Sequence, residues 1–253
     1  MNHARRGYAL VINNKVFEPK LDMGRRDGTD RDAASLDLSL TKLGFHVKVC
    51  HNATAGHMRD ILLKFSKMDH SNNDCFVCVI MSHGDNGIVY GTDQEVEIDQ
   101  LIHPFKFNRT LAGKPKVFLI QACRGTNLME GIDSNPYEIQ YCSKIPLEAD
   151  FLIGYSTIAG YYSWRNSANG SWFIQSLCDI LNESGTKLEI MQLLTAVNRK
   201  VAYYFESNTN EPSMHGKKQI PCIVSMLTKE LYFRPKSSNK LPTTVSHNFH
   251  EEI

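Results

Sequence analysis

Short apolar runs alternate with segments of helical periodicity along most of this 253-residue chain. Residues 75–81 form a continuous apolar run, which is the pattern of a strand covered by helices on both faces. Residues 45–49 alternate apolar and polar side chains, as a half-buried or edge strand does. We therefore expect strands at residues 8–12, 45–49, 75–81, 116–120 and 150–155, and closing strand material at residues 222–227 and 230–233.

The segments between these strands carry helix signals. Thr29 or Asp30 can cap a first helix, and Gly44 is its stop signal. Thr54 can cap a second helix. A hairpin is expected at residues 87–98, and further helices at residues 98–105, 170–181 and 187–205. Strands that alternate with helices predict an α/β fold with a mostly parallel central sheet and helices on both faces.

Reactive side chains follow two of the predicted strands directly. His83 comes just after the run at residues 75–81, and Cys123 just after the run at residues 116–120. Residues beyond the carboxyl ends of parallel strands converge on one crevice. A thiol and an imidazole brought together there can act as a nucleophile and its acid–base partner.

Two arginines and a glutamine are expected at the same crevice. Arg26 follows the first predicted strand, Arg165 follows the strand that ends at Tyr155, and Gln121 stands two residues before Cys123. Paired guanidiniums suit a carboxylate, which arginine binds through two hydrogen bonds. Arg25 is an adjacent alternative to Arg26, and water-facing surface charge is the competing interpretation of both arginines.

Composition limits the class of protein. A formal net charge of +1 gives no electrostatic footprint for nucleic acid or an anionic membrane surface, and no apolar run approaches the ~18 residues of a membrane span. The seven cysteines lie mostly inside apolar runs, as buried free thiols of a reducing cytoplasm do. Cys75 and Cys78 have redox or zinc spacing but no second ligand pair, so we expect no metal and no cofactor.

The motif Gln121-Ala122-Cys123-Arg124-Gly125, with a histidine 40 residues upstream, resembles the signature of the caspase family. The resemblance extends over roughly residues 7–233. It implies a three-layer caspase-like sandwich and a cysteine endopeptidase of the executioner type that cuts proteins after aspartate. It also implies that the backbone amides of Gly84 and Cys123 form the oxyanion hole.

The resemblance assigns substrate contacts as well. Arg26, Gln121 and Arg165 would line the pocket for the P1 aspartate, with Arg26 preferred to Arg25 because R-D-G-T-D fits the family pattern. Ser163 and Arg165 would offer backbone groups to an added peptide strand. Residues 206–216 lack the aromatic side chains usual in effector caspases, and Met214 stands where an aromatic wall is common. The other expected contacts are apolar walls from Tyr162, Trp164 and Trp172, and a DxxD-type P4 aspartate site near Asn166 and Trp172.

The resemblance further implies how the chain is processed and assembled. Residues 1–133 would form the large subunit, 134–145 a linker, 146–233 the small subunit and 234–253 a disordered tail, with cleavage after Asp133. Expected partners are protein substrates, a second copy paired through residues 222–226, an upstream initiator caspase and IAP-type inhibitors.

Two other functions compete with this one. A catalytically idle homologue that only binds partners is the main alternative. A peptidase that cuts after arginine or lysine is disfavoured, because two arginines in the primary pocket would repel a basic side chain.

Overall fold

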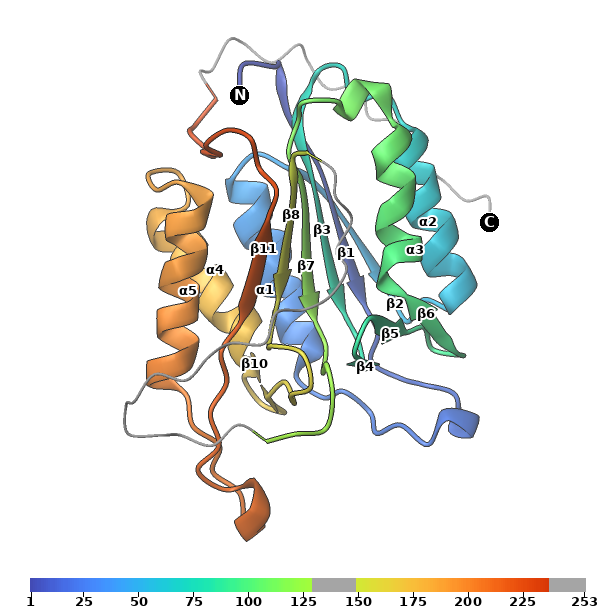
Figure 1. Ribbon diagram of the computed structural model, residues 1–253, viewed down its shortest axis with the longest axis vertical. Helices are drawn as coiled ribbons and strands as arrows, with labels where there is room; N and C mark the ends of the chain where they lie inside the picture. The colour runs from blue at the N-terminus through green and yellow to red at the C-terminus, as the bar shows by residue number, and fades with distance from the viewer. Residues whose placement is uncertain (129–148, 237–253) are drawn as a thin grey trace.

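The computed structural model describes residues 1–128 and 149–236. A six-stranded sheet in the order β11-β8-β7-β3-β1-β2 runs through its middle (Figure 1). Neighbouring strands are parallel except for β11, which pairs antiparallel with β8. The strands are β1 (Arg5–Asn13), β2 (His46–His51), β3 (Asn73–Met81), β7 (Lys116–Gln121), β8 (Phe151–Tyr155) and β11 (Cys222–Ser225).

Helices cover both faces of the sheet and make it the middle of three layers (Figure 1). One face carries α1 (Thr29–Lys42), α4 (Trp172–Ser184) and α5 (Ile190–Tyr204), and the other carries α2 (Ala55–Lys67) and α3 (Ile98–Ile102). Each face of the sheet has its own hydrophobic core, because successive side chains of a strand point to opposite faces. From β1, Ala9 and Val11 pack in the core on the side of α1, α4 and α5, and Leu10 and Ile12 pack in the core on the side of α2 and α3. The predicted three-layer α/β sandwich is confirmed.

Two small sheets and several short 3₁₀ helices lie outside the central sheet. The predicted hairpin belongs to a three-stranded sheet of β4 (Gly84–Asp85), β5 (Ile88–Tyr90) and β6 (Glu95–Glu97). A second small ribbon pairs β9 (Arg165–Asn166) with β10 (Gly170–Ser171). Single 3₁₀ turns are η1 (Pro19–Leu21), η2 (His103–Phe107), η3 (Arg109–Leu111) and η4 (Pro212–Met214).

Two local predictions are wrong. Neither Thr29 nor Asp30 caps α1, because the N-cap is Gly28 at φ 88°, with no side-chain cap bond. Residues 230–233 form no strand of the central sheet and make only an isolated bridge, between Glu189 and Tyr232. Thr54 does cap α2, accepting from the backbone N–H of His57.

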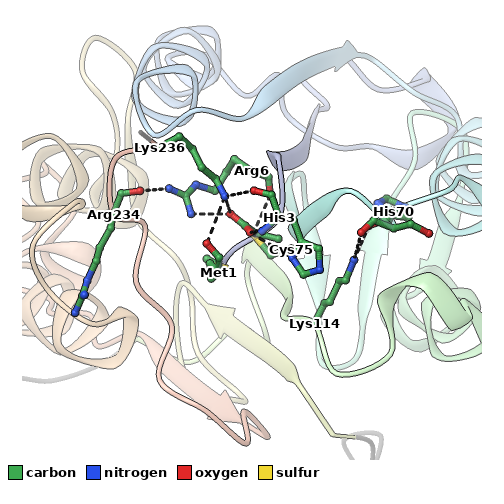
Figure 2. Close-up of polar contacts among 10 residues, drawn as sticks. Met1, His3, Arg6, His70, Cys75, Lys114, Arg234 and Lys236 are labelled. Atoms are coloured by element: carbon green, nitrogen blue, oxygen red, sulfur yellow. Dashed lines mark hydrogen bonds and ion pairs between the residues drawn. The ribbon is translucent and has the colours of Figure 1, made fainter. Parts of the chain in front are cut away.

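A polar cluster ties the two ends of the described chain together at the amino-terminal edge of the sheet. The Asp74 carboxylate lies 3.1 Å from Nη1 of Arg6, and Lys236 pairs with the same carboxylate (Figure 2). The backbone N–H of His3 donates to it as well, at 3.0 Å. A cavity of about 660 Å³ beside the cluster is lined partly by His3, Arg6 and Lys236. Since β1 starts at Arg5 and ends at Asn13, this cavity lies at the opposite edge from Cys123.

Several predictions fall on residues outside the described ranges. Asp133, the linker at 134–145 and most of the tail at 234–253 are among them. The division into two subunits therefore stays a prediction. Within residues 1–128 and 149–236, no helix has the length and apolar character needed to cross a bilayer.

Candidate active site

The register of the parallel strands brings the candidate catalytic residues to one edge of the sheet. Asn13 lies opposite Met81, and Met81 opposite Gln121, so β1, β3 and β7 end level with one another. Ser82 donates its backbone N–H to the carbonyl of Gln121 at 3.1 Å, which keeps the two chains together past the strands. His83 and Cys123 each follow within two residues of these ends.

His83 is oriented by a backbone carbonyl. Its Nε2 lies 2.7 Å from the carbonyl oxygen of Gly24, and its ring packs against Phe17 with centroids 4.8 Å apart. A carbonyl only accepts, so Nε2 carries the proton and Nδ1 keeps its lone pair. Burial lowers the pKa of His83, and the hydrogen bond to Gly24 partly opposes this by raising it. The positive charges of Arg26 and Arg165 lower the pKa further. The ring is thus neutral and ready to take a proton through Nδ1.

The thiol of Cys123 lies against the backbone of Ser163. The Ser163 N–H points at Sγ at 3.5 Å. Burial raises the pKa of Cys123, while the Ser163 contact, Arg26 and Arg165 oppose that rise. The resting group is therefore a neutral thiol, which needs a base to become a nucleophile.

Gly84 lets the histidine loop approach the cysteine loop closely. A Cβ built on Gly84 would lie 2.8 Å from the Cβ of Ala122 and 3.0 Å from the carbonyl oxygen of Cys123. Any other residue would push the two loops apart. The glycine thus places its backbone beside the reactive thiol, where an oxyanion hole has to be.

Arg26 is almost wholly enclosed, with 1% of its surface exposed. Its Nη1 donates to the carbonyl of Asn14 at 2.7 Å and to the hydroxyl of Thr29 at 3.1 Å. Burial lowers its pKa to about 9, with a further contribution from the like charge of Arg165. The interpretation of Arg26 as water-facing surface charge is therefore wrong. Arg25, in contrast, is exposed and pairs with Asp27.

Arg165 and Gln121 complete the polar surroundings of the thiol. Arg165 is half-buried and donates from Nε to the carbonyl of Asp27 at 2.8 Å. Gln121 donates from Nε2 to the hydroxyl of Ser163 at 2.8 Å. Its Oε1 is buried and has no hydrogen-bond partner among the residues that the structure describes.

Asp32 is a buried counter-charge that the sequence did not reveal. Both of its oxygens accept the backbone N–H of Ser171, at 2.9 and 3.1 Å, and it interacts electrostatically with Arg26 and Arg165. Burial raises its pKa to about 6 despite these contacts. Gly170 allows the approach, since a Cβ there would lie 2.2 Å from Oδ1 of Asp32.

The predicted apolar walls differ in exposure. Trp164 and Trp172 are each 7% exposed and stack at 5.6 Å within the core cluster, so most of their surface packs inward. Tyr162 is 37% exposed and contacts Trp164 edge-on at 5.2 Å. Of the three rings, Tyr162 is the one that presents a face to solvent.

The remaining predicted contacts occupy the loops around these rings. Asn166 is exposed, and its Oδ1 accepts the N–H groups of Ala168 and Asn169, so its side chain shapes a turn. Met214 lies in η4 and packs partly buried against the core cluster. Within residues 1–128 and 149–236, neither side chain forms a hydrogen bond with Cys123, Arg26 or Arg165.

Gln219 is a further residue that sequence reasoning missed. Its Oε1 accepts the N–H of Trp164 at 2.7 Å, and its Nε2 donates to the carbonyl of Ser156 at 2.7 Å. It therefore clamps both ends of the segment that carries Ser163 beside the thiol. A buried glutamine next to apolar residues gives no signal of this kind in a sequence.

The two cysteines with redox or zinc spacing lie in the core. Cys75 and Cys78 are completely buried in β3, and burial raises the pKa of Cys75 to about 12 and that of Cys78 as well. No group of three potential metal ligands occurs within residues 1–128 and 149–236.

Comparison with known proteins identifies the family of the chain. The family model described as the caspase domain matches residues 6–232. The chain is 50% identical over 243 residues to caspase-7 of Gallus gallus, covering 92% of this chain and 79% of the relative. It is 52% identical over 237 residues to caspase-3 of Mus musculus, covering 92% and 86%.

A solved structure agrees at the level of the fold. The crystal structure of caspase-1 from Spodoptera frugiperda superposes with a TM-score of 0.86 at 42% identity, covering 93% of this chain and 94% of that one. With the sequence match and the layered fold in agreement over almost the whole length, the chain belongs to the caspase family.

Proposed function

We propose that Cys123 is the nucleophile of this aspartate-specific cysteine endopeptidase and His83 its general base and acid. His83 takes the thiol proton on Nδ1 as Sγ attacks the carbonyl carbon of the scissile peptide bond. The tetrahedral intermediate collapses to a thioester when the C–N bond breaks, and the leaving amine receives the proton from His83. Water, activated by His83, then hydrolyses the thioester and restores the thiol.

The backbone amides of Gly84 and Cys123 stabilise the oxyanion of this intermediate. In enzymes that use an oxyanion hole, removal of one such hydrogen-bond donor lowers kcat by ~10²–10³-fold. The absence of room for a side chain at Gly84 supports the assignment, because it keeps the two backbones in contact.

Arg26, Gln121 and Arg165 hold the carboxylate of the P1 aspartate. The observation that carries this proposal is geometric: Arg26 is enclosed with 1% of its surface exposed, and Nε of Arg165 donates to the carbonyl of Asp27, the residue next to Arg26. The single carboxylate of Asp32 offsets only one of these two positive charges, so the site keeps an excess positive charge that favours a negative ligand. A substrate carboxylate supplies it, whereas a lysine or arginine at P1 would be repelled.

Residues upstream of P1 lie along the loop from 162 to 172. Ser163 and Arg165 pair with the peptide backbone as with an added strand. Tyr162 provides the exposed apolar wall, Trp164 and Trp172 contribute only their accessible edges, and Asn166 faces a P4 aspartate in DxxD-like substrates. Met214 closes the P2 side without an aromatic ring.

Assembly and activation follow the executioner pattern. The edge of β11 is the strand that pairs with a second copy, and cleavage after Asp133 turns the dimer of zymogens into a heterotetramer of large and small subunits. An upstream initiator caspase makes this cut in the cytoplasm, and IAP-type inhibitors bind the site. The antiparallel, half-buried β11 at the end of the sheet supports the pairing.

Hydrolysis of a fluorogenic tetrapeptide that ends in aspartate tests the site, with Glu, Asn and Lys versions beside it. Fast turnover of the aspartate peptide alone, absent from Cys123→Ala, is expected. Turnover of the lysine peptide would contradict the pocket assignment. Silence that persists after deliberate cleavage of the linker would instead identify an idle homologue.

Intact-mass analysis tests the activation step. An active preparation is expected to contain a fragment ending at Asp133, and Asp133→Ala is expected to stay uncut. Full activity with no such fragment would rule out this cut as the activating event.

A further inference from the structure

The motif R-D-G-T-D is expected to supply Arg26 to the P1 pocket, and that role does not explain its threonine, Thr29. Thr29 is fully buried at the first position of α1, yet its hydroxyl does not cap the helix. Gly28, at φ 88°, turns the chain so sharply that the hydroxyl faces Arg26 and Asn13 instead.

The direction of every hydrogen bond around Thr29 is fixed by chemistry. A guanidinium can only donate, so the bond of 3.1 Å from Nη1 of Arg26 must end on the Thr29 oxygen. The hydroxyl proton is then free to go only to Oδ1 of Asn13, at 2.6 Å. The Asn13 amide in turn donates from Nδ2 to Oδ1 of Asp30, at 2.9 Å.

This chain of bonds leaves Arg26 restrained on one side alone. Nη1 is held by Thr29 and by the carbonyl of Asn14. Nε and Nη2 make no hydrogen bond to any residue within 1–128 or 149–236. A guanidinium held by one nitrogen keeps a defined plane and offers the others to a second partner, which is the geometry that paired binding of a carboxylate requires.

We propose that Thr29 and Asn13 are positioning residues that set the plane of the Arg26 guanidinium for the P1 carboxylate. This inference rests on the proposed function, in which Arg26 binds that carboxylate. Thr29 touches neither substrate nor thiol and acts only through Arg26. Asn13 fixes the rotation of the Thr29 hydroxyl, and it is fully buried at the end of β1.

Two matched pairs of variants isolate the hydroxyl. Thr29→Val keeps the branched shape and removes the hydroxyl, while Thr29→Ser keeps the hydroxyl and removes the methyl group. Thr29→Ala and Thr29→Ser differ by the hydroxyl alone, so this pair serves if the valine variant fails to fold. Ser176→Ala removes a buried hydroxyl that has no hydrogen-bond partner among the described residues, and it is the control.

Steady-state kinetics with P1-aspartate and P1-glutamate tetrapeptides give the readout. We expect Thr29→Val and Thr29→Ala to lower kcat/KM for the aspartate peptide by about 10- to 100-fold, the range of a lost hydrogen bond to a charged group. The loss is expected mainly in KM, together with a smaller aspartate-to-glutamate preference. Thr29→Ser and Ser176→Ala should stay close to the wild type.

Alkylation of Cys123 by iodoacetamide, a neutral reagent that needs no arginine, separates positioning from general damage. The rate is expected to be the same in wild type, Thr29→Val and Thr29→Ala. Three results would each overturn the inference. The first is an equal loss of kcat/KM in the serine, alanine and valine variants, and the second is wild-type kinetics in Thr29→Val. The third is an alkylation rate that falls together with kcat/KM.

Arg26→Ala distinguishes a failure of the P1-pocket assignment from a failure of the positioning role. If it leaves kcat/KM for the aspartate peptide unchanged, the pocket assignment itself is wrong. If it abolishes turnover while Thr29→Val keeps the wild-type kcat/KM, the pocket assignment stands and only the positioning role fails.

Discussion

Nε of Arg165 donates to the backbone carbonyl of Asp27 at 2.8 Å, which joins two loops 138 residues apart in the chain. Asp27 directly follows Arg26, so the bond fixes one arginine relative to the other. Gly28 brings the loops still closer, since a Cβ there would lie 2.4 Å from the carbonyl oxygen of Asn166. The two guanidiniums are therefore placed by one continuous contact between loops.

Gly28→Ala is expected to separate these loops. The substitution adds a Cβ where there is no space, and φ 88° costs a residue other than glycine about 1–2 kcal/mol. We expect a lower midpoint of denaturant unfolding and a large rise in KM for P1-aspartate peptides. Gly87→Ala, also at positive φ but with no atom within 4 Å of the added Cβ, is the control for backbone strain alone. Equal effects of the two substitutions would argue against the loop contact.

Asp32→Asn is expected to remove a pH dependence of stability. Burial raises the folded-state pKa of Asp32 from 3.8 to about 6, so the folded protein binds a proton here that the unfolded chain releases. The wild type therefore loses stability as the pH rises from about 4 to about 6, by about 3 kcal/mol at 1.36 kcal/mol per pH unit. The loss is complete above about pH 6.

Urea unfolding of both proteins from pH 4 to 8 measures this effect. The free energy of unfolding of Asp32→Asn minus that of the wild type should increase between pH 4 and 6 and stay level above. Asp37→Asn, which makes the same change at an exposed position of the same helix, is the control. A difference that does not vary with pH would show that Asp32 is ionised throughout.

The free enzyme is expected to hold Cys123 as a neutral thiol at rest, rather than as the thiolate of an ion pair with His83. Burial raises the pKa of Cys123 and lowers that of His83, so no proton moves between them at rest near neutral pH. The rate of iodoacetamide alkylation in the absence of substrate should keep rising from pH 6 to 9. A plateau already at pH 6 would mean that the thiolate is preformed. Cys123→Ala defines the background from the other cysteines.

Gln219→Leu is expected to loosen the segment between Ser156 and Trp164. The change leaves the Trp164 N–H and the Ser156 carbonyl without their buried partner, at about 1–3 kcal/mol for each unsatisfied group. We expect lower thermal stability and a lower kcat/KM, since Ser163 lies within this segment. Gln100→Leu, on the surface of α3, is the matched control and should change neither quantity. Unchanged activity with lost stability would limit Gln219 to a structural role.

Much of the fold followed from local pattern. The continuous apolar run at 75–81 became the central, fully buried β3, and the alternating run at 45–49 became the edge strand β2. Residues 230–233 were predicted wrongly as strand material, because β11 already ends the sheet and leaves only an isolated bridge to Glu189. Apolar pattern reports which residues are buried, but not which neighbour they pair with.

The sequence by itself determined most of the strands of the central sheet, and that Cys123, His83, Arg26 and Arg165 follow strands that end at one edge of it. Hydrophobic periodicity is a local property, and it fixes which residues follow a strand. The tertiary structure alone decided what surrounds these groups. Three hydrogen bonds show this, because each joins segments that are 16 to 139 residues apart in the chain. They link His83 to the carbonyl of Gly24, Ser171 to the carboxylate of Asp32, and the hydroxyl of Thr29 to Asn13. Buried polar groups take whichever partner the packed chain brings within about 3 Å, and no local pattern records that choice.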